Sequence, residues 1–273
     1  MGRRHDLRLG TCGWSYPDWV GPFYAEGTDP GAFLTAYALH FDTVEVDSTF
    51  YRMPTAEQID HWRQMTPRNF QFCLKVPQLI THEKVLQGCR DDFRNFAEAV
   101  RGLGNKLRCV LLQFGYFNKQ AFAHHKSFFE RLDQFLAAAA PEELPIAVEI
   151  RNKTWLNPQW FELLKKHHAS TVLIDHPWMP SIPEVIEKYD VDTGPLAYVR
   201  LLGDREAIEK QTQSWGKTVV DRAAPLRDLA ASLQELNKHI DVVVFANNHY
   251  AGHAPATLTD FSALIGREPS IHE

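Results

Sequence analysis

The chain has 273 residues, of which 44% are hydrophobic and 23% are charged. This is an ordinary globular composition, and the length suits one large domain such as a barrel of eight βα units, which takes about 250 residues. The formal charge of −5 and the pI near 6.2 argue against a general binder of duplex DNA or of anionic membranes, although they permit a local basic patch.

Two further features indicate a cytoplasmic protein. The four cysteines, Cys12, Cys73, Cys89 and Cys109, form no C-x-x-C pair, so we expect reduced and mostly buried thiols. The first six residues contain no apolar signal-peptide segment, and no apolar run approaches the ~20 residues of a membrane helix. We therefore expect a soluble protein without a membrane partner.

Eight strand-like runs follow one another along the chain, and each is followed by a helical pattern or its shortened remnant. The expected strands are residues 7–14, 43–51, 70–77, 107–115, 145–151, 170–175, 196–203 and 241–248. The expected helices are residues 30–39, 55–65, 91–102, 119–140, a helix from 158, and residues 184–189, 225–238 and 257–266. Thr55-Ala-Glu-Gln58 has the form of a capping box, and Asn157-Pro158 that of an N-cap followed by proline. Residues 80–84 are expected to form a loop, and the stretch from 203 to 218 has no clear period.

The alternation of strands and helices predicts a barrel. Right-handed crossovers make successive strands parallel, and eight such units close on themselves. We therefore predict an α/β fold, a TIM-like (β/α)8 barrel, as a single domain over residues 1–273 with a core of about 7–266 and irregular segments after strands six and seven. The rival is an open doubly wound sheet, which usually has a Gly-rich phosphate turn after an early strand, and Gly10-Thr-Cys-Gly13 is not one.

Ionisable side chains recur at the carboxyl ends of the expected strands, which elsewhere are mainly Val, Ile, Leu and Phe. In such barrels these ends form the reactive face. In Pro145–Arg151, Glu149 and Arg151 stand two residues apart, so they point the same way. A charged pair in an apolar strand is costly unless something uses it. The other charged strand ends carry Glu45, Asp47, Lys75, Asp175 and Arg200.

We expect these charges to converge on one pocket, where partly dry surroundings shift pKa values as acid–base catalysis requires. Glu149 and Asp175 are the predicted acid–base pair, with Glu45 as an alternative carboxylate. Lys75 is predicted to be a catalytic amine or a clamp for an anion. Structural alternatives stay open: Glu149 and Arg151 as an ion pair that plugs the barrel, Lys75 paired with Glu45 or Asp47, and Asp175 as an orienting hydrogen-bond partner.

Other groups at the same ends are predicted to bind the substrate. Arg200 is suited to grip a phosphate or carboxylate bidentately. Trp14 opens an aromatic Gly/Pro loop that extends to Tyr24, and this loop either covers a cleft or encloses a small core. The predicted substrate-binding set is Arg151, Arg200, Trp14, Tyr51, His82, Gln113, Asn247 and Asn248.

No cofactor and no metal is predicted, because none of the thirteen histidines belongs to an H-E-x-x-H, H-x-H or comparable motif. His82, His176, His249 and His253 fall in loops on the expected reactive face, so a metal site assembled from distant loops stays open. Phosphate binding after strands seven and eight has weak support, since that region lacks a paired Gly-rich loop.

Several segments together resemble the YecE-like family, whose members carry domain of unknown function 72. The resemblance extends from about Leu7 to Leu264 and implies a closed or slightly irregular TIM-like barrel with no established activity. The chain departs from the family pattern at Cys12, at Gln113-Phe-Gly115, after Gly203 and at residues 246–252. The last two departures fall beside the expected pocket, so they put substrate details in doubt. The matching segments are Gly13-Trp-Ser-Tyr16, Glu45-Val-Asp-Ser-Thr-Phe-Tyr51, Phe72-Cys-Leu-Lys-Val-Pro77, Ile80-Thr-His82, Val148-Glu-Ile-Arg151 and Tyr198-Val-Arg200.

The working hypothesis is a hydrolase or lyase that acts on a small anionic, sugar-like or phosphorylated substrate. The competing class is a non-catalytic protein that binds a small ligand or single-stranded nucleic acid, whose bases stack on aromatic rings near a basic groove. Duplex nucleic acid is not an expected partner, and the sequence makes no prediction of oligomeric state.

Overall fold

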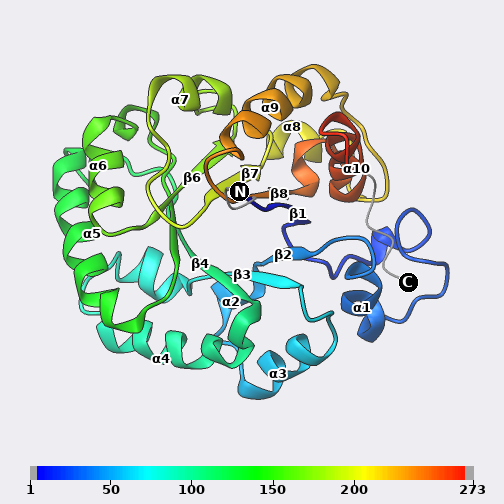
Figure 1. Cartoon of the computed structure of the whole chain (residues 1–273), viewed down its shortest axis with the longest axis horizontal. Coiled ribbons are helices and arrows are strands. Elements are labelled where there is room, and N and C mark those ends of the chain that lie inside the picture. The colour runs from blue at the N-terminus through cyan, green and yellow to red at the C-terminus, as the bar shows by residue number, and fades with distance from the viewer. Residues whose placement is uncertain (1–4, 268–273) are drawn as a thin grey trace.

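The computed structural model describes residues 5–267 and contains eight parallel strands surrounded by helices, as predicted (Figure 1). The strands are short and mostly buried on both faces, because their inner side chains fill the barrel and their outer side chains meet the helices. Their bounds are β1 Leu7–Thr11, β2 Thr43–Val46, β3 Gln71–Lys75, β4 Leu107–Gln113, β5 Ile146–Glu149, β6 Ser170–Asp175, β7 Ala197–Leu201 and β8 Val242–Ala246.

The barrel is nearly closed, and its seam lies between β1 and β2. The hydrogen-bonded order is β1-β8-β7-β6-β5-β4-β3-β2. The two end strands meet through an isolated bridge between Cys12 and Glu45, where the Gly13 N–H donates to the Glu45 carbonyl at 2.8 Å. The seam therefore brings Glu45 next to the first strand.

The hydroxyl of Tyr37 replaces strand-to-strand hydrogen bonds along this seam. It accepts from the Thr11 backbone N–H at 2.8 Å and donates to the Thr43 carbonyl at 3.0 Å. Gly10 permits the close approach, because a Cβ atom there would lie 2.2 Å from the Thr43 carbonyl oxygen. The absent side chain of Gly10 thus lets the barrel close.

The helices form the outer ring, and the capping hydrogen bonds predicted for two of them are present. The Thr55 side chain accepts from the Gln58 N–H while the Gln58 side chain accepts from the Thr55 N–H, and Asn157 caps its helix through the Trp160 N–H. No helix within residues 5–267 is long and apolar enough to cross a membrane. The helices are α1 Phe33–Tyr37, α2 Ser48–Tyr51, α3 Ala56–Gln64, α4 Arg90–Val100, α5 His125–Ala139, α6 Pro158–Lys166, α7 Ile182–Lys188, α8 Arg205–Glu209, α9 Ala223–Leu236 and α10 Ala254–Leu264.

Three segments differ from the sequence-based prediction. The strand expected over residues 43–51 is wrong in its second half, where residues 48–51 form α2 and the Thr49 hydroxyl donates to the Lys75 carbonyl at 2.7 Å. The Thr49 hydroxyl also contacts the Val46 carbonyl at 3.2 Å, and Ser or Thr side chains that bond nearby backbone in this way favour turns over strands. The expected loop at 80–84 lies mostly in a π-helical turn, Leu79–Glu83, and the aperiodic stretch after Gly203 contains α8.

The aromatic loop after β1 encloses a small core of its own. Trp19 and Tyr24 are almost fully buried, and the Tyr24 ring stacks on Phe33 at 4.7 Å between centroids. All four cysteines are free and buried, as expected, and Cys73 and Cys109 pack inside the barrel. The loop is therefore a packed part of the wall and does not cover the cleft described below.

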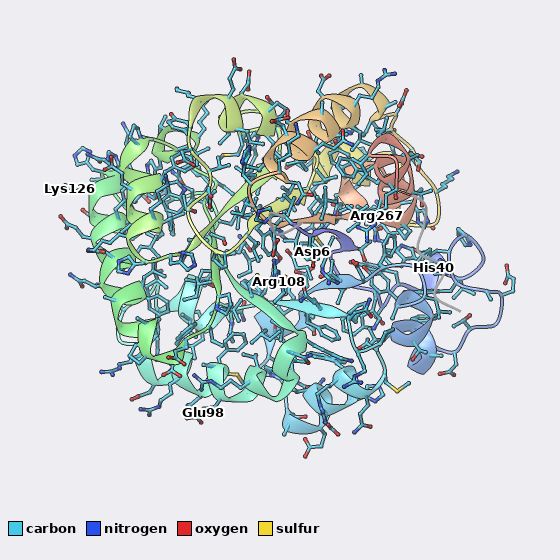
Figure 2. The ribbon with its side chains drawn as sticks, viewed as in Figure 1. Asp6, His40, Glu98, Arg108, Lys126 and Arg267 are labelled. Atoms are coloured by element: carbon cyan, nitrogen blue, oxygen red, sulfur yellow. The ribbon has the colours of Figure 1, made fainter. Side chains whose placement is uncertain are left out.

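A second group of charges lies at the amino ends of the strands. Arg108 donates to Asp241 at 2.6 Å, and Arg267 pairs with Asp42 at 3.2 Å. Figure 2 shows Asp6 and Arg108 near the middle of the ring of helices, with Arg267 toward α10. In barrels of this kind, residues at the amino ends of the strands contribute to stability, whereas catalytic residues lie at the carboxyl ends.

Candidate functional site

Three charged residues from three strands meet inside the carboxyl end of the barrel. Arg200 of β7 donates from Nη2 to Glu45 of β2 at 2.7 Å and from Nη1 to Glu149 of β5 at 2.5 Å. Both carboxylates are fully buried, and Arg200 is 2% exposed. Buried charges of this kind need partners with good geometry, since each one loses its hydration. The three side chains therefore form one unit.

The unit extends at both ends. The Tyr198 hydroxyl donates to Oε2 of Glu45 at 2.6 Å, and Nε of Arg151 donates to Oε1 of Glu149 at 2.9 Å. Signs alternate from Glu45 through Arg200 and Glu149 to Arg151, so each charge has an opposite neighbour. We call these five residues the charge relay. Its negative groups are buried, and its outer end is the positive Arg151.

The relay keeps Glu149 ionised. Burial raises its pKa, but the charges of Arg200 and Arg151 and the hydrogen bond from Arg200 outweigh burial and hold the pKa at about 2. Burial also disfavours the charged form of Arg200, yet Glu149 and Glu45 raise its pKa well above the usual range. Glu149 is thus a fixed anion that orients two arginines.

A cleft of about 270 Å³ opens above the relay at the carboxyl ends of the strands. Lys75 faces it and forms an ion pair with Asp47 at 2.8 Å, which is one of the two pairings that the sequence left open. Within residues 5–267 the terminal nitrogens of Arg151 have no hydrogen-bond partner. The cleft is lined by Asp47, Phe50, Tyr51, Lys75, Gln113, Arg151, His176, Arg200, Leu202, Gly203, Arg205, Asn247 and His249.

Two histidines line the cleft, and both are favoured as neutral imidazoles. Burial and then the charge of Arg151 lower the pKa of His176, whose Nδ1 accepts from the Trp178 N–H at 3.3 Å. Acceptance at Nδ1 leaves Nε2 as the protonated nitrogen, a hydrogen-bond donor. Burial also lowers the pKa of His249, which contacts Glu209 of α8 at 3.1 Å. His249 thus ties α8 to the end of β8.

Four of the predicted site residues belong neither to this lining nor to the charge relay. Trp14 packs edge-on against Trp62 with centroids 5.8 Å apart, and the Asn248 side chain accepts from the Ala254 N–H at the start of α10. His82 is an exposed residue beside Phe50, with its ring 5.0 Å from the Phe50 ring, and partial burial of the imidazole lowers its pKa. Asp175 accepts from the Tyr250 hydroxyl at 3.1 Å, and burial raises its pKa despite that bond.

The predicted set is therefore divided. Lys75, Tyr51, Gln113, Arg151, Arg200 and Asn247 come together in the cleft, and Glu45 and Glu149 lie behind it in the relay. No observation assigns a reaction to any of them, so their catalytic and substrate-binding roles stay predictions. Sequence reasoning left out of its set Asp47, Phe50, His176, Arg205 and His249 of the lining and Tyr198 of the relay.

Some of these omissions left a signal in the sequence. Asp47 had already been noted as a strand-end charge, and Tyr198 stands two residues before Arg200, hence on the same face of β7. His176 directly follows the end of β6. Within residues 5–267 no group of three or more His, Cys, Asp or Glu side chains is placed to hold a metal ion.

Comparisons with known proteins agree with this architecture. The profile described as "Protein of unknown function DUF72" matches residues 8–272. UPF0759 protein YecE of Escherichia coli K12 is 31% identical over 159 residues, which cover 57% of this chain and only half of that protein's length. UPF0759 protein YunF of Bacillus subtilis is 26% identical over 91% of this chain and 90% of its own.

A solved structure extends the agreement to three dimensions. A DUF72 family protein from Thermotoga maritima superimposes with a TM-score of 0.75 at 25% identity, over 96% of this chain and all of that one. The resemblance inferred from short sequence segments is thereby confirmed. The chain belongs to the DUF72 family, whose description names no activity.

Proposed function

We propose that the cleft is the reactive centre of a hydrolase or lyase that acts on a small anionic substrate, sugar-like or phosphorylated. One observation carries the proposal. Glu149 fixes Arg151 at Nε, while both terminal nitrogens of Arg151 have no partner within the described chain and Arg151 lines the cleft. A guanidinium held in this way presents a planar pair of donors, which matches a carboxylate or a phosphate.

The placement of charge supports anion binding. The relay carboxylates are fully buried behind Arg200, whereas the Arg151 side chain is 26% exposed at the cleft. An anion in the cleft therefore meets the positive end of the relay first, together with Lys75. Arg205 lies at the same cleft, but its side chain is 75% exposed, whereas that of Lys75 is 13% exposed, so we assign the anion to Arg151 and Lys75.

The proposed chemistry differs from the acid–base pair expected from the sequence. Glu149, with a pKa near 2 and two arginine partners, is suited to positioning and not to proton transfer. We assign proton abstraction to Asp47, a cleft carboxylate beside Lys75, either from water or from the substrate. Lys75, Arg151 and Nε2 of His176 would donate hydrogen bonds to the oxygen on which negative charge develops.

A second candidate is a non-catalytic binding protein. It is favoured by the same relay, because Arg200 neutralises both buried carboxylates and leaves neither free to move a proton. The cleft would then fix an anionic ligand without converting it. The two candidates share the anion site and differ in turnover.

A substrate screen separates them. Purified protein is incubated with panels of sugar phosphates, phosphodiesters, glycosides and hydroxy acids, and products are followed by mass spectrometry. For any substrate found, Asp47→Asn should lower kcat at least a hundredfold with KM little changed, whereas Arg68→Ala on the far side of the barrel should change neither. Saturable binding of panel members without product would favour the binding protein, and turnover that survives Asp47→Asn would refute the assigned base.

A further inference from the structure

Large exposed aromatic rings gather on one face of the molecule. Among residues 5–267, Tyr51 is 74% exposed, Tyr116 63% and Trp178 65%, and no other aromatic residue reaches these values. All three lie in segments that follow carboxyl ends of strands: β2, β4 and β6. Exposed Met53 and Leu79 follow β2 and β3 in the same way. We call Tyr51, Tyr116 and Trp178 the aromatic rim.

The rim borders the cleft along a continuous arc. Strands β2, β3, β4, β5 and β6 are consecutive neighbours in the sheet, so the segments that follow them are neighbours too. Tyr51 itself lines the cleft beside Lys75 and Arg151. Apolar groups left in water over a contiguous area mark a place where another molecule binds.

Exposed cations alternate with these rings. Arg52 follows Tyr51, Lys119 lies three residues after Tyr116, and Lys153 lies in the segment between β5 and α6. Within the part of the chain that the structure describes, none of the three forms an ion pair. One exposed acid, Glu83, lies in the same arc after β3. The arc therefore combines stacking surfaces with free positive charge, although the whole chain has a formal charge of −5.

We propose that the aromatic rim binds single-stranded nucleic acid, with bases stacked on the rings, phosphates near Arg52, Lys119 and Lys153, and one phosphate at Arg151 in the cleft. This inference rests on the proposed function for its last contact, the anion at Arg151, and otherwise goes beyond it. A single strand exposes one flat base at every nucleotide, and its backbone carries one negative phosphate between successive bases. A duplex hides its ring faces, and an acidic polysaccharide has none.

Fluorescence anisotropy with a labelled thymidine 12-mer tests the stacking. Tyr116→Ala/Trp178→Ala should weaken binding at least tenfold, because each base stacked on an aromatic ring contributes favourable binding free energy and this variant removes two such rings. Tyr116→Phe/Trp178→Phe should stay within threefold of the parent, since phenylalanine also stacks. Leu39→Ala/Leu264→Ala removes two exposed apolar side chains away from the rim, 45% and 38% exposed, and should change nothing. All six substitutions are at exposed positions, and melting curves will verify the fold.

Salt dependence tests the cations. For single strands, log K falls with log salt by about 0.7 for each phosphate neutralised. Arg52→Ala/Lys119→Ala/Lys153→Ala should therefore make the slope shallower by about 2. The matched control, Arg68→Ala/Lys126→Ala/Arg227→Ala, removes three exposed cations elsewhere and should leave the slope unchanged. Figure 2 shows Lys126 at the outer edge of the ring, on α5.

Clear outcomes would overturn the inference. These are a parent protein that fails to bind the 12-mer at low salt, an Ala pair that binds as the parent does, or equally tight binding of the duplex or of polyphosphate. Binding of inorganic phosphate to the Tyr116→Ala/Trp178→Ala variant separates this inference from the proposed function, because neither residue lines the cleft. If phosphate binding needs Arg151 but the rim fails its tests, only the rim inference falls. If phosphate binding is independent of Arg151, the proposed function falls.

Discussion

Arg200 and Glu149, from β7 and β5, pair at 2.5 Å inside the barrel, and the second terminal nitrogen of Arg200 reaches Glu45 at 2.7 Å. Removal of the shared cation would leave two carboxylates buried without it. Breaking a buried pair from one side costs about 3–5 kcal/mol, and we expect Arg200→Met to lose about that much free energy of unfolding in urea titrations.

A charge-matched variant supplies the control for this prediction. Glu45→Gln/Arg200→Met/Glu149→Gln removes all three charges together and should recover most of the lost stability, because no unpaired carboxylate stays buried. A loss below about 1 kcal/mol in Arg200→Met alone would mean that the relay is not the buried unit described above.

The relay also predicts an acid dependence of stability. The pKa of Glu149 falls from 4.5 to about 2 on folding, so its contribution is present above pH 4.5 and disappears as the pH falls toward 2. A difference of this size corresponds to about 3 kcal/mol. The gap in unfolding free energy between the parent and Glu149→Gln should therefore narrow steadily from pH 5 to pH 2.5. A gap that stays constant over this range would contradict the assigned pKa.

The third prediction concerns His176. Burial and the charge of Arg151 lower its pKa, so Arg151→Met should raise that pKa toward the usual value of an exposed histidine. Titration of the imidazole resonances by two-dimensional NMR measures the change directly. Lys126→Met, which removes a distant cation, should leave the His176 titration where it is in the parent. An unchanged His176 pKa in Arg151→Met would show that the charge of Arg151 does not act on this imidazole.

The seam of the barrel gives a prediction about folding. Gly10→Ala would place a Cβ atom 2.2 Å from the Thr43 carbonyl oxygen, so β1 and β2 must move apart. Overpacking of this kind costs about 1–3 kcal/mol, which urea denaturation would detect. Gly115→Ala serves as the control, because its Cβ would meet no atom within 4 Å. Equal stability of the two variants would show that the seam tolerates separation.

Much of the fold follows from local patterns in the sequence. Each strand is an apolar run with turn signals on both sides, and eight of them in alternation with helices leave few topologies. The capping box at Thr55 fixes the start of α3 without reference to the rest of the chain. By contrast, residues 48–51 extend an apparently good strand in the sequence but form a helix, in which Thr49 donates to the distant Lys75 carbonyl.

The site was harder to predict for a related reason. Strand periodicity places Glu149 on one face of β5, but it does not reveal that Arg200 lies between Glu149 and Glu45. Glu149 lies 51 positions and Glu45 lies 155 positions before Arg200 in the sequence, so these two contacts form only when the barrel closes. Trp14 shows the reverse case, because its neighbours leave open either a cleft cover or a small core, while tertiary packing places it against Trp62. The position of the site in the fold could be predicted from the topology, whereas the hydrogen-bond partners of its residues could not.

The central claim is that Arg151, oriented by Glu149, holds an anion in the cleft. Isothermal titration of inorganic phosphate into the parent, Arg151→Met and Arg68→Met tests it most directly. A charge-assisted hydrogen bond contributes about 1.5–3 kcal/mol, so Arg151→Met should weaken phosphate binding at least tenfold while Arg68→Met binds as the parent does. Equal affinity in all three proteins, or no binding by the parent, would contradict the account.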